Sequence, residues 1–238
     1  MNKVLGMSKV AIVTGAGKGM GAGILKQLAA EGYKVAAMSP SGAAKTLAES
    51  VGGIGLAGSN AVAADVEALV KLTLDTFGRI DAVVNNTGHP PKGPLLEITD
   101  EAWLQGFELV HLSVVRMLRL VTPVMERQGS GSIVNLLTYA TLEPEADFPV
   151  SGPVRAALAA FTKVYADLYA PKGIRINNVL PGFIDSLPEK AERKARIPMG
   201  RYGRVAEIAG AVSFLLSDAA GYITGQNLRV DGGITKSL

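Results

Sequence analysis

The sequence contains no cysteine and only two histidines, His89 and His111. Disulfide bonds, zinc–thiolate sites and cysteine nucleophiles are therefore excluded, and so is a histidine-rich metal cage. Charged residues make up 19% of the chain, its net charge is +3, and no run of Lys or Arg stands out. This charge pattern is not typical of a nucleic-acid-binding protein. We therefore expect no metal site and no nucleic-acid partner.

Long apolar segments are missing as well. The most apolar later stretch, residues 208–228, is broken by Asp218, Gly221 and Gly225. It predicts a buried helix, a turn and a strand rather than a membrane span. The first nine residues lack an apolar region followed by a small-residue cleavage site, so we expect no signal peptide. Together these features predict a cytoplasmic protein with no membrane partner.

Short apolar runs alternate with helical patterns along the whole chain of 238 residues. Apolar runs closed by turn residues predict strands at residues 10–13, 34–38, 61–64, 80–84, 133–137, 174–179 and 227–230. Apolar positions at helical spacing predict helices at residues 21–31, 43–51, 67–77, 100–127, 152–169 and 205–217. This order predicts an α/β Rossmann fold: one domain, 1–238, with a doubly wound, mostly parallel seven-stranded sheet covered by helices on both faces.

Two segments, 142–150 and 184–198, have no clear periodicity. They follow the fifth and sixth predicted strands, so we expect them at the carboxyl ends of the strands. Open α/β sheets bind their ligands at that edge. These two segments should therefore shape a substrate site, although their conformation and the substrate itself are not readable from the sequence.

Residues 14–21, Thr-Gly-Ala-Gly-Lys-Gly-Met-Gly, join the first predicted strand to the first helix. Glycine allows a tight turn and a close approach of the backbone to a pyrophosphate. The following helix offers free N–H groups and the positive end of its dipole to phosphates. Because the motif follows an apolar strand and opens a helix, it predicts a dinucleotide site. The residues expected at the phosphates are Gly15, Gly17, Lys18, Gly19, Met20 and Gly21.

This glycine pattern resembles that of the short-chain dehydrogenase/reductase superfamily, and further motifs match it in order. Asp65-Val66 looks like the end of the third strand, where that family contacts adenine. Asn85-Asn86-Thr87-Gly88 resembles the family's Asn-Asn-Ala-Gly motif. The segment from Gly200-Arg201 to Asp231-Gly232-Gly233 is similar to the tail of bacterial 3-oxoacyl-(acyl carrier protein) reductases. The resemblance implies cofactor contacts from Asp65, Val66, Asn86 and Gly88, and nicotinamide contacts from Pro181, Gly182, Ile184 and Ser186.

The second predicted strand ends in Met38-Ser39-Pro40-Ser41, without a carboxylate. Members of the family that bind NAD place an acid there for the ribose diol. A 2′-phosphate instead needs a cation and hydroxyl donors, which Lys18, Ser39 and Ser41 offer. NADP(H) is therefore the favoured cofactor, and NAD(H) remains open.

The resembling family uses an Asn, a Ser, a Tyr and a Lys for catalysis. Spacing places Val110, Thr138, Ser151 and Arg155 at these positions, so the tetrad is altered. Thr138 keeps a hydroxyl, and Arg155 can still bind ribose hydroxyls. However, a guanidinium of pKa above about 12 cannot shuttle protons. Ser151 is a far weaker acid than a phenol of pKa about 10, so the usual proton relay is missing.

Two residues are candidate replacement acids. His89 follows the Asn-Asn-Thr-Gly motif and has a suitable ordinary pKa of about 6.5. Tyr139 directly follows Thr138 and is the nearest phenol in sequence, although a packing role is the plainer interpretation. His111 lies in a long apolar helix, which favours a structural role.

The favoured function is an NADP(H)-dependent oxidoreductase that transfers a hydride to or from a small carbonyl, alcohol or imine. The alternatives are a cofactor-binding protein without redox turnover, which would be a sensor or an inactive subunit, and a non-redox lyase or isomerase that reuses the pocket. The resemblance further implies a homo-oligomer, tetramer or dimer, formed through the helices predicted at 100–127 and 152–169.

Overall fold

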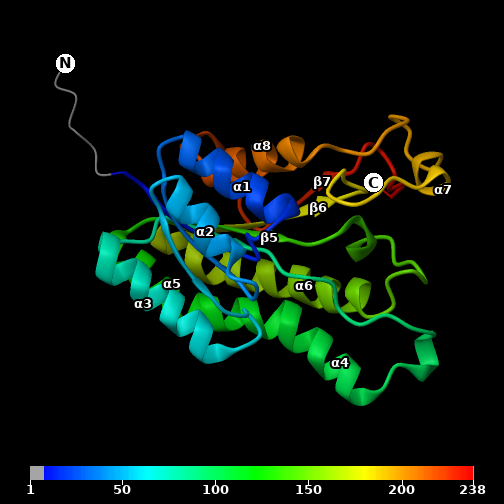
Figure 1. The fold of residues 1–238 in the computed structure, drawn as a ribbon, viewed down its shortest axis with the longest axis horizontal. Coiled ribbons are helices and arrows are strands. Elements are labelled where there is room, and N and C mark those ends of the chain that lie inside the picture. The colour runs from blue at the N-terminus through cyan, green and yellow to red at the C-terminus, as the bar shows by residue number, and fades with distance from the viewer. Residues whose placement is uncertain (1–7, 238) are drawn as a thin grey trace.

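The computed structural model describes residues 8–237 and contains a seven-stranded sheet (Figure 1). The strands are β1 (Val10–Thr14), β2 (Lys34–Ser39), β3 (Ile54–Ala57), β4 (Ala82–Asn85), β5 (Gly131–Leu136), β6 (Ile174–Pro181) and β7 (Asn227–Val230). Their order is β3-β2-β1-β4-β5-β6-β7, and each adjacent pair is parallel. The order reverses between β1 and β4, where sheets of this kind bind ligands. The predicted fold class is confirmed, whereas the prediction about a signal peptide concerns residues 1–7, which lie outside the described residues.

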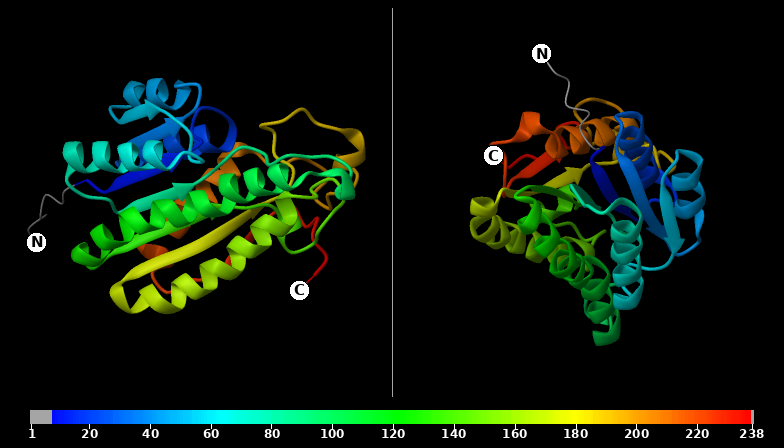
Figure 2. Two further views of the ribbon diagram at one scale, coloured as in Figure 1. Left: turned by 90° about the horizontal axis from the view of Figure 1, so that it is seen from below. Right: turned by 90° about the vertical axis from the view of Figure 1, so that its left-hand side faces the viewer.

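Helices cover both faces of the sheet, as the views in Figure 2 show. One face carries α1 (Gly19–Ala30), α2 (Ala43–Ser50) and α8 (Val205–Leu216). The other carries α3 (Ala63–Phe77), α5 (Ser113–Gln128) and α6 (Ser151–Tyr169). Every residue of β1 is buried, which explains why a short, continuously apolar run forms this central strand. Along residues 8–237, no helix is long and apolar enough to cross a membrane.

The prediction for the third strand was wrong. β3 is Ile54–Ala57, an edge strand interrupted by glycine and only half buried, so it lacks the continuous apolar run of a central strand. The predicted strand at 61–64 instead leads into α3, where alanine favours the helix. Asp65 and Val66 therefore lie in the first turn of α3. Val66 is buried in the core, and the Asp65 carboxylate accepts a hydrogen bond from the backbone N–H of Ser59, so neither lies at the end of the third strand, on which the expected adenine contact depended.

The helical pattern predicted at 100–127 is confirmed with one interruption. α4 (Asp100–Phe107) continues through a π-helical segment, Glu108–Leu112, into α5. Such single π turns are rare and frequently occur at functional sites. Val110 lies in this segment with 1% of its surface exposed and packs in the core. An apolar side chain therefore occupies the position that the resemblance assigns to the family's Asn.

Four asparagines on neighbouring strands form a ladder near the carboxyl ends of β4 and β5. Asn85 is paired in register with Asn135, Asn135 with Asn178, and Asn178 with Asn227. Each side-chain amide donates to the next side-chain oxygen, at 2.9, 3.0 and 2.7 Å. Because buried amides must find partners, this ladder penalises any slip of register among the strands that hold the site.

The two segments without periodicity leave the carboxyl ends of β5 and β6, as predicted. The second contains one short helix, α7 (Ala191–Lys194), which extends beyond that end of the sheet together with the C-terminal segment (Figure 1). A small apolar cluster joins the two segments and contains Tyr139, Phe183 and Tyr202. The region beyond the carboxyl ends of the strands is therefore built from parts of the chain that are distant in sequence.

Candidate functional site

The turn between β1 and α1 requires its glycines. Gly15 and Gly19 have φ values of +59° and +57°, which residues with a Cβ rarely adopt. A Cβ on Gly21 would lie 2.4 Å from the carbonyl oxygen of Gly15, and one on Gly17 would lie 2.8 Å from Oγ of Ser39. The backbone of this turn thus folds tightly against Asn86 and Ser39, which leaves no room for side chains at Gly15, Gly17 and Gly21. A turn without side chains at these positions is what a phosphate approaching the start of α1 needs.

Asn86 holds this turn in place. Its backbone N–H donates to the hydroxyl of Thr14, at 3.0 Å, and that hydroxyl donates to the backbone oxygen of Asn86, at 2.8 Å. The Asn86 side-chain amide donates to the carbonyl oxygen of Gly15, at 3.0 Å. Two sequence motifs that are about seventy residues apart therefore form one rigid unit. The predicted role of Asn86 at the cofactor is consequently one of positioning the glycine turn.

A cavity of about 300 Å³ lies at the carboxyl ends of the strands. Residues predicted to bind the cofactor form one wall: Met20, Asn86, Arg155, Pro181, Gly182, Ile184 and Ser186. The predicted catalytic residues, Thr138, Tyr139, Ser151, Arg155 and His89, also line it. The turn glycines, Lys18, Ser39, Ser41 and Gly88 lie outside this lining. The structure thus brings the predicted catalytic residues, drawn from two loops and α6, to one cavity.

Arg155 is the most unusual residue of the cavity. Only 6% of its surface is exposed, and burial lowers its pKa to about 10. Its Nε donates to Oγ of Ser151, at 3.1 Å, and its Nη1 donates to the carbonyl oxygen of Leu136, at 2.8 Å. No carboxylate of residues 8–237 forms an ion pair with it. A buried guanidinium without an anion is costly, so this arrangement points to a partner outside the chain.

Sequence reasoning missed several residues that line the cavity, among them Thr87, Lys92, Phe148 and Arg193. The hydroxyl of Thr87 is buried without a hydrogen-bond partner among the described residues. Asn60, in the turn that follows β3, lines a small void together with Val110 and Arg155. The Thr-for-Ala difference in the Asn-Asn-Thr-Gly motif was a usable signal for Thr87. No sequence signal pointed to Asn60, because the position of β3 was mispredicted.

The two candidate acids, His89 and Tyr139, differ in their burial and in the direction of their pKa shifts. His89 is at the mouth of the cavity, and its pKa is lowered by desolvation and by the positive charges of Arg155, Lys92 and Lys18. Tyr139 is 2% exposed, and its hydroxyl donates to the Glu145 carboxylate, at 2.9 Å. Burial and this carboxylate raise the pKa of Tyr139. Tyr139 is therefore poorly suited to give up a proton.

The residues predicted to select the dinucleotide lie at the end of β2 and in the glycine turn. Ser39 is buried, and its Oγ accepts a hydrogen bond from the backbone N–H of Ala44, at 3.0 Å. Ser41 is exposed, and its Oγ accepts from the N–H of Ala43, at 3.4 Å. Lys18 is exposed and forms no ion pair within residues 8–237. Lys18 is thus the cation at this position that is available to a ligand.

These observations fit a dinucleotide. The glycine turn is so tight that a Cβ at Gly15, Gly17 or Gly21 would clash with the protein, and α1 begins without a side-chain cap among the described residues. Thr87, whose hydroxyl has no partner among the described residues, and Arg155, which has no ion pair there, both line the adjoining cavity. In the described part of the chain, no group of three His, Asp or Glu residues is arranged to hold a metal ion.

Comparisons with known proteins agree with this geometry. Residues 15–235 match the family described as enoyl-(acyl carrier protein) reductase. The chain is 37% identical over 239 residues to the 3-oxoacyl-[acyl-carrier-protein] reductase of Synechocystis, an alignment that covers 95% of this chain and 97% of the relative. It is 36% identical to the enzyme of the same name from Vibrio cholerae, with 95% and 97% covered.

A similar solved structure is L-sorbose reductase from Gluconobacter frateurii, a crystal structure complexed with NADPH and L-sorbose. The two chains share 28% of their residues, and the alignment covers 97% of this chain and 98% of the other with a TM-score of 0.87. The family match, the near-complete coverage and the strand order agree with one another. The chain therefore belongs to the short-chain dehydrogenase/reductase superfamily of oxidoreductases.

Proposed function

We propose that this protein is an NADP(H)-dependent oxidoreductase with an altered catalytic site, acting on a small carbonyl, alcohol or imine. The observation that carries the proposal is Arg155, a buried cation that faces the cavity without an anion of the chain beside it. When bound, the nicotinamide cofactor supplies or accepts a hydride. Arg155, Thr87, Pro181 and Gly182 are the residues placed to hold its nicotinamide end.

The preference for NADP(H) is supported by the residues around the end of β2. No carboxylate stands in the segment 38–41, and Lys18 is an exposed cation in the neighbouring glycine turn. Ser41 adds an exposed hydroxyl. The complex of L-sorbose reductase with NADPH is consistent with this choice, because that protein shares the whole fold.

Ser151 and Arg155 replace a Tyr and a Lys as a hydrogen-bonding pair. Because Nε of Arg155 donates to Oγ of Ser151, the hydroxyl proton of Ser151 remains available to a substrate oxygen. Thr138 lines the same cavity with a second hydroxyl. Both groups orient a carbonyl oxygen, and the guanidinium charge stabilises negative charge that develops there. Neither group can transfer a proton as a phenol does, so the pair polarises and positions the substrate.

His89 is the remaining candidate for proton transfer, since the hydroxyl of Tyr139 is committed to Glu145. Its lowered pKa makes the protonated form scarce at neutral pH. A substrate that needs little proton assistance, such as an iminium or a conjugated enone, suits this site best. Water at the mouth of the cavity is the other proton source for reduction.

The direct test has two stages. Titration with NADPH and NADP⁺, followed by fluorescence, should show binding; no binding of either would exclude both an oxidoreductase and a cofactor sensor, and would leave the lyase or isomerase. A panel of carbonyl and imine substrates followed at 340 nm should then show turnover. Binding without turnover of any substrate would favour the sensor or inactive subunit.

We also propose that the protein is a homo-oligomer. A groove between α5 and α6 is lined by apolar side chains, and Val164 and Leu168 are 58% and 63% exposed there. A second copy of the chain would bury this surface. Light scattering coupled to size-exclusion chromatography tests the proposal, and a monomer mass at micromolar concentration would contradict it.

A further inference from the structure

The mouth of the cavity carries positive charge on an aromatic wall. Three rings form this wall, with Tyr139 in edge contact with both Phe148 and Phe183, at centroid distances of 6.0 and 5.4 Å. The Nζ atom of Lys92 lies 4.9 Å from the centroid of Phe148. The guanidinium carbon of Arg193 lies 5.0 Å from the centroid of Phe183. Each end of the wall therefore holds a cation against a ring face.

These cations come from segments that are far apart in sequence. Lys92 follows β4, Phe148 precedes α6, and Arg193 belongs to α7. All three line the same cavity. A cation held against a ring loses part of its freedom before any ligand arrives, so less entropy is lost when it binds an anion. The arrangement is that of a preorganised anion site.

Acidic side chains do not neutralise the cavity from within. None of the described residues that line it is Asp or Glu. The Glu145 carboxylate is engaged by Arg196 and by the Tyr139 hydroxyl. Asp147 lies 3.6 Å from Arg193, but its side chain is 64% exposed, which weakens this ion pair by solvent screening. Lys92 has no ion-pair partner within residues 8–237.

The positive field extends through the cavity. Arg155, Lys92 and Lys18 all lower the pKa of His89, which shows that their charges converge on the space beside it. Lys18 belongs to the proposed 2′-phosphate site, and Arg155 belongs to the catalytic end. Lys92 and Arg193 are therefore the cations that neither the cofactor nor the reacting oxygen uses.

Depth separates the two ends of the cavity. Arg155 is 6% exposed, whereas Lys92 is exposed at the mouth. A substrate whose reacting carbon lies at Ser151 must therefore present any anionic group at its opposite end. The cavity volume of about 300 Å³ is at the lower limit for small-molecule sites, roughly 300–1,000 Å³, and the nicotinamide end of the proposed cofactor would take part of it. This favours a compact ring over a long acyl chain.

We propose that the substrate is a compact, ring-bearing carbonyl compound or alcohol with a carboxylate at the end remote from the reacting carbon. The ring packs on the wall of Tyr139, Phe148 and Phe183, and the carboxylate binds Lys92 and Arg193. This inference rests on the proposed function for the identity of the reacting carbon. The recognition of the carboxylate itself stands on the cavity alone.

A matched pair of probes tests the carboxylate contact: 4-acetylbenzoate and its methyl ester, which share the ring and the ketone but differ in charge. Calorimetric titration is done on the full chain with and without NADP⁺, which gives no turnover with a ketone. We expect the acid to bind about tenfold more tightly than the ester. Lys92→Met, which keeps the length of the stem, should reduce that difference to within about twofold. Arg193→Met should reduce it less, because Asp147 already offsets part of the charge.

The control variant is Lys71→Met, on the exposed face of α3, where Lys71 pairs with Asp75. It should leave the preference for the acid unchanged. Equal affinity for acid and ester in the unmodified protein would overturn the inference, as would a preference that survives in Lys92→Met or the binding of neither probe at millimolar concentration. Failure of NADP⁺ to bind would instead contradict the proposed function, and the acid-to-ester ratio measured without cofactor would still decide the carboxylate site.

Discussion

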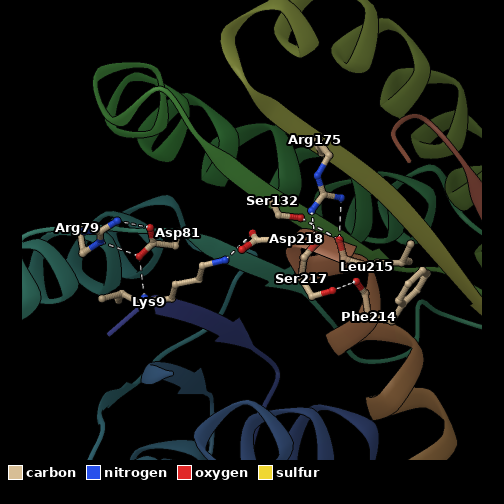
Figure 3. A network of polar contacts seen from close by, with 10 residues as sticks. Lys9, Arg79, Asp81, Ser132, Arg175, Phe214, Leu215, Ser217 and Asp218 are labelled. Carbon is tan, nitrogen blue, oxygen red and sulfur yellow. Dashed lines mark hydrogen bonds and ion pairs between the residues drawn. The ribbon is translucent and has the colours of Figure 1, made fainter. Parts of the chain in front are cut away.

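Charged groups at the amino ends and at the carboxyl ends of the strands differ in the partners that they have within the protein. At the amino end, each charged group drawn in Figure 3 has a partner within the protein. Arg175 donates to the carbonyl oxygens of Leu215 and Ser217 at the end of α8, at 2.8 and 3.0 Å. Asp81 pairs with Arg79 and accepts from the backbone N–H of Val10, at 2.8 Å. These contacts fasten the helix and strand ends to each other.

At the carboxyl end, polar groups remain without partners. Neither Arg155 nor Arg175 makes an ion pair with a described carboxylate, but Arg155 is more deeply buried and donates to one carbonyl oxygen, whereas Arg175 donates to three. The Thr87 hydroxyl makes no hydrogen bond with a described residue. Native folds rarely leave such groups unsatisfied unless a ligand or a function explains them. The comparison leads us to expect that the arginine at the amino end stabilises the fold, while the arginine at the carboxyl end binds a ligand.

The largest expected effect is a gain of function. Ser151→Tyr combined with Arg155→Lys restores the two groups that the family uses, beside the proposed cofactor site. Proton transfer by a placed side chain is worth about 10²–10⁴-fold in rate. We expect ketone reduction by NADPH to increase by that order, measured at 340 nm. An unchanged rate in a folded double variant would contradict the view that the missing relay alone limits the site.

The next effect concerns the amino end. Arg175→Met removes the charged hydrogen bonds to the carbonyl oxygens of Leu215 and Ser217 at the end of α8, and hydrogen bonds to charged groups are worth about 1.5–3 kcal/mol. We expect the free energy of unfolding, measured in urea, to fall by about 2–3 kcal/mol. NADPH affinity should not change. A loss of affinity with intact stability would erase the distinction between the two ends.

A smaller effect is expected at the proposed 2′-phosphate site. Lys18→Ala removes the exposed cation of the glycine turn and should weaken NADPH binding about tenfold, with NADH binding unchanged. Lys26→Ala is the matched control, because Lys26 is exposed on the same helix, α1. Equal losses for NADPH and NADH would show that Lys18 contacts the pyrophosphate rather than a 2′-phosphate.

The smallest effect concerns pH. Burial lowers the pKa values of His89 and His111 below the unfolded value of about 6.5. Below that pH the unfolded chain binds more protons than the folded one, so stability is complete above it and decreases as the pH falls. The variant His89→Gln/His111→Gln should lose less stability between pH 7.5 and 5.5 than the unmodified protein. Identical losses in urea denaturation would show that neither histidine contributes.

Much of the fold follows from local patterns. Continuous apolar runs such as Val10–Thr14 form the buried strands, and the glycine motif marks the turn that follows. β3 escaped prediction because an edge strand needs little apolar surface, and Gly55 interrupts it. The asparagine ladder was not predicted either, because the partner of each amide is decided only by the register between neighbouring strands.

The residues of the site were likewise predictable from the sequence only in part. Thr138, Ser151 and Arg155 could be placed from spacing along regular elements, and all three line the cavity. Lys92 and Arg193 could not be placed from the sequence, because they lie in segments without periodicity whose path depends on aromatic packing. A loop lysine is usually solvated, and its position over Phe148 becomes visible only in three dimensions.

The most direct test of the central claim is the variant Arg155→Met, examined for both NADPH affinity and stability. If Arg155 is kept for a ligand, NADPH should bind at least about tenfold more weakly. The free energy of unfolding should stay within about 1 kcal/mol of the unmodified protein, because removing a buried unpaired charge offsets the lost hydrogen bonds. Unchanged NADPH affinity, together with a loss of stability like that of Arg175→Met, would contradict the account.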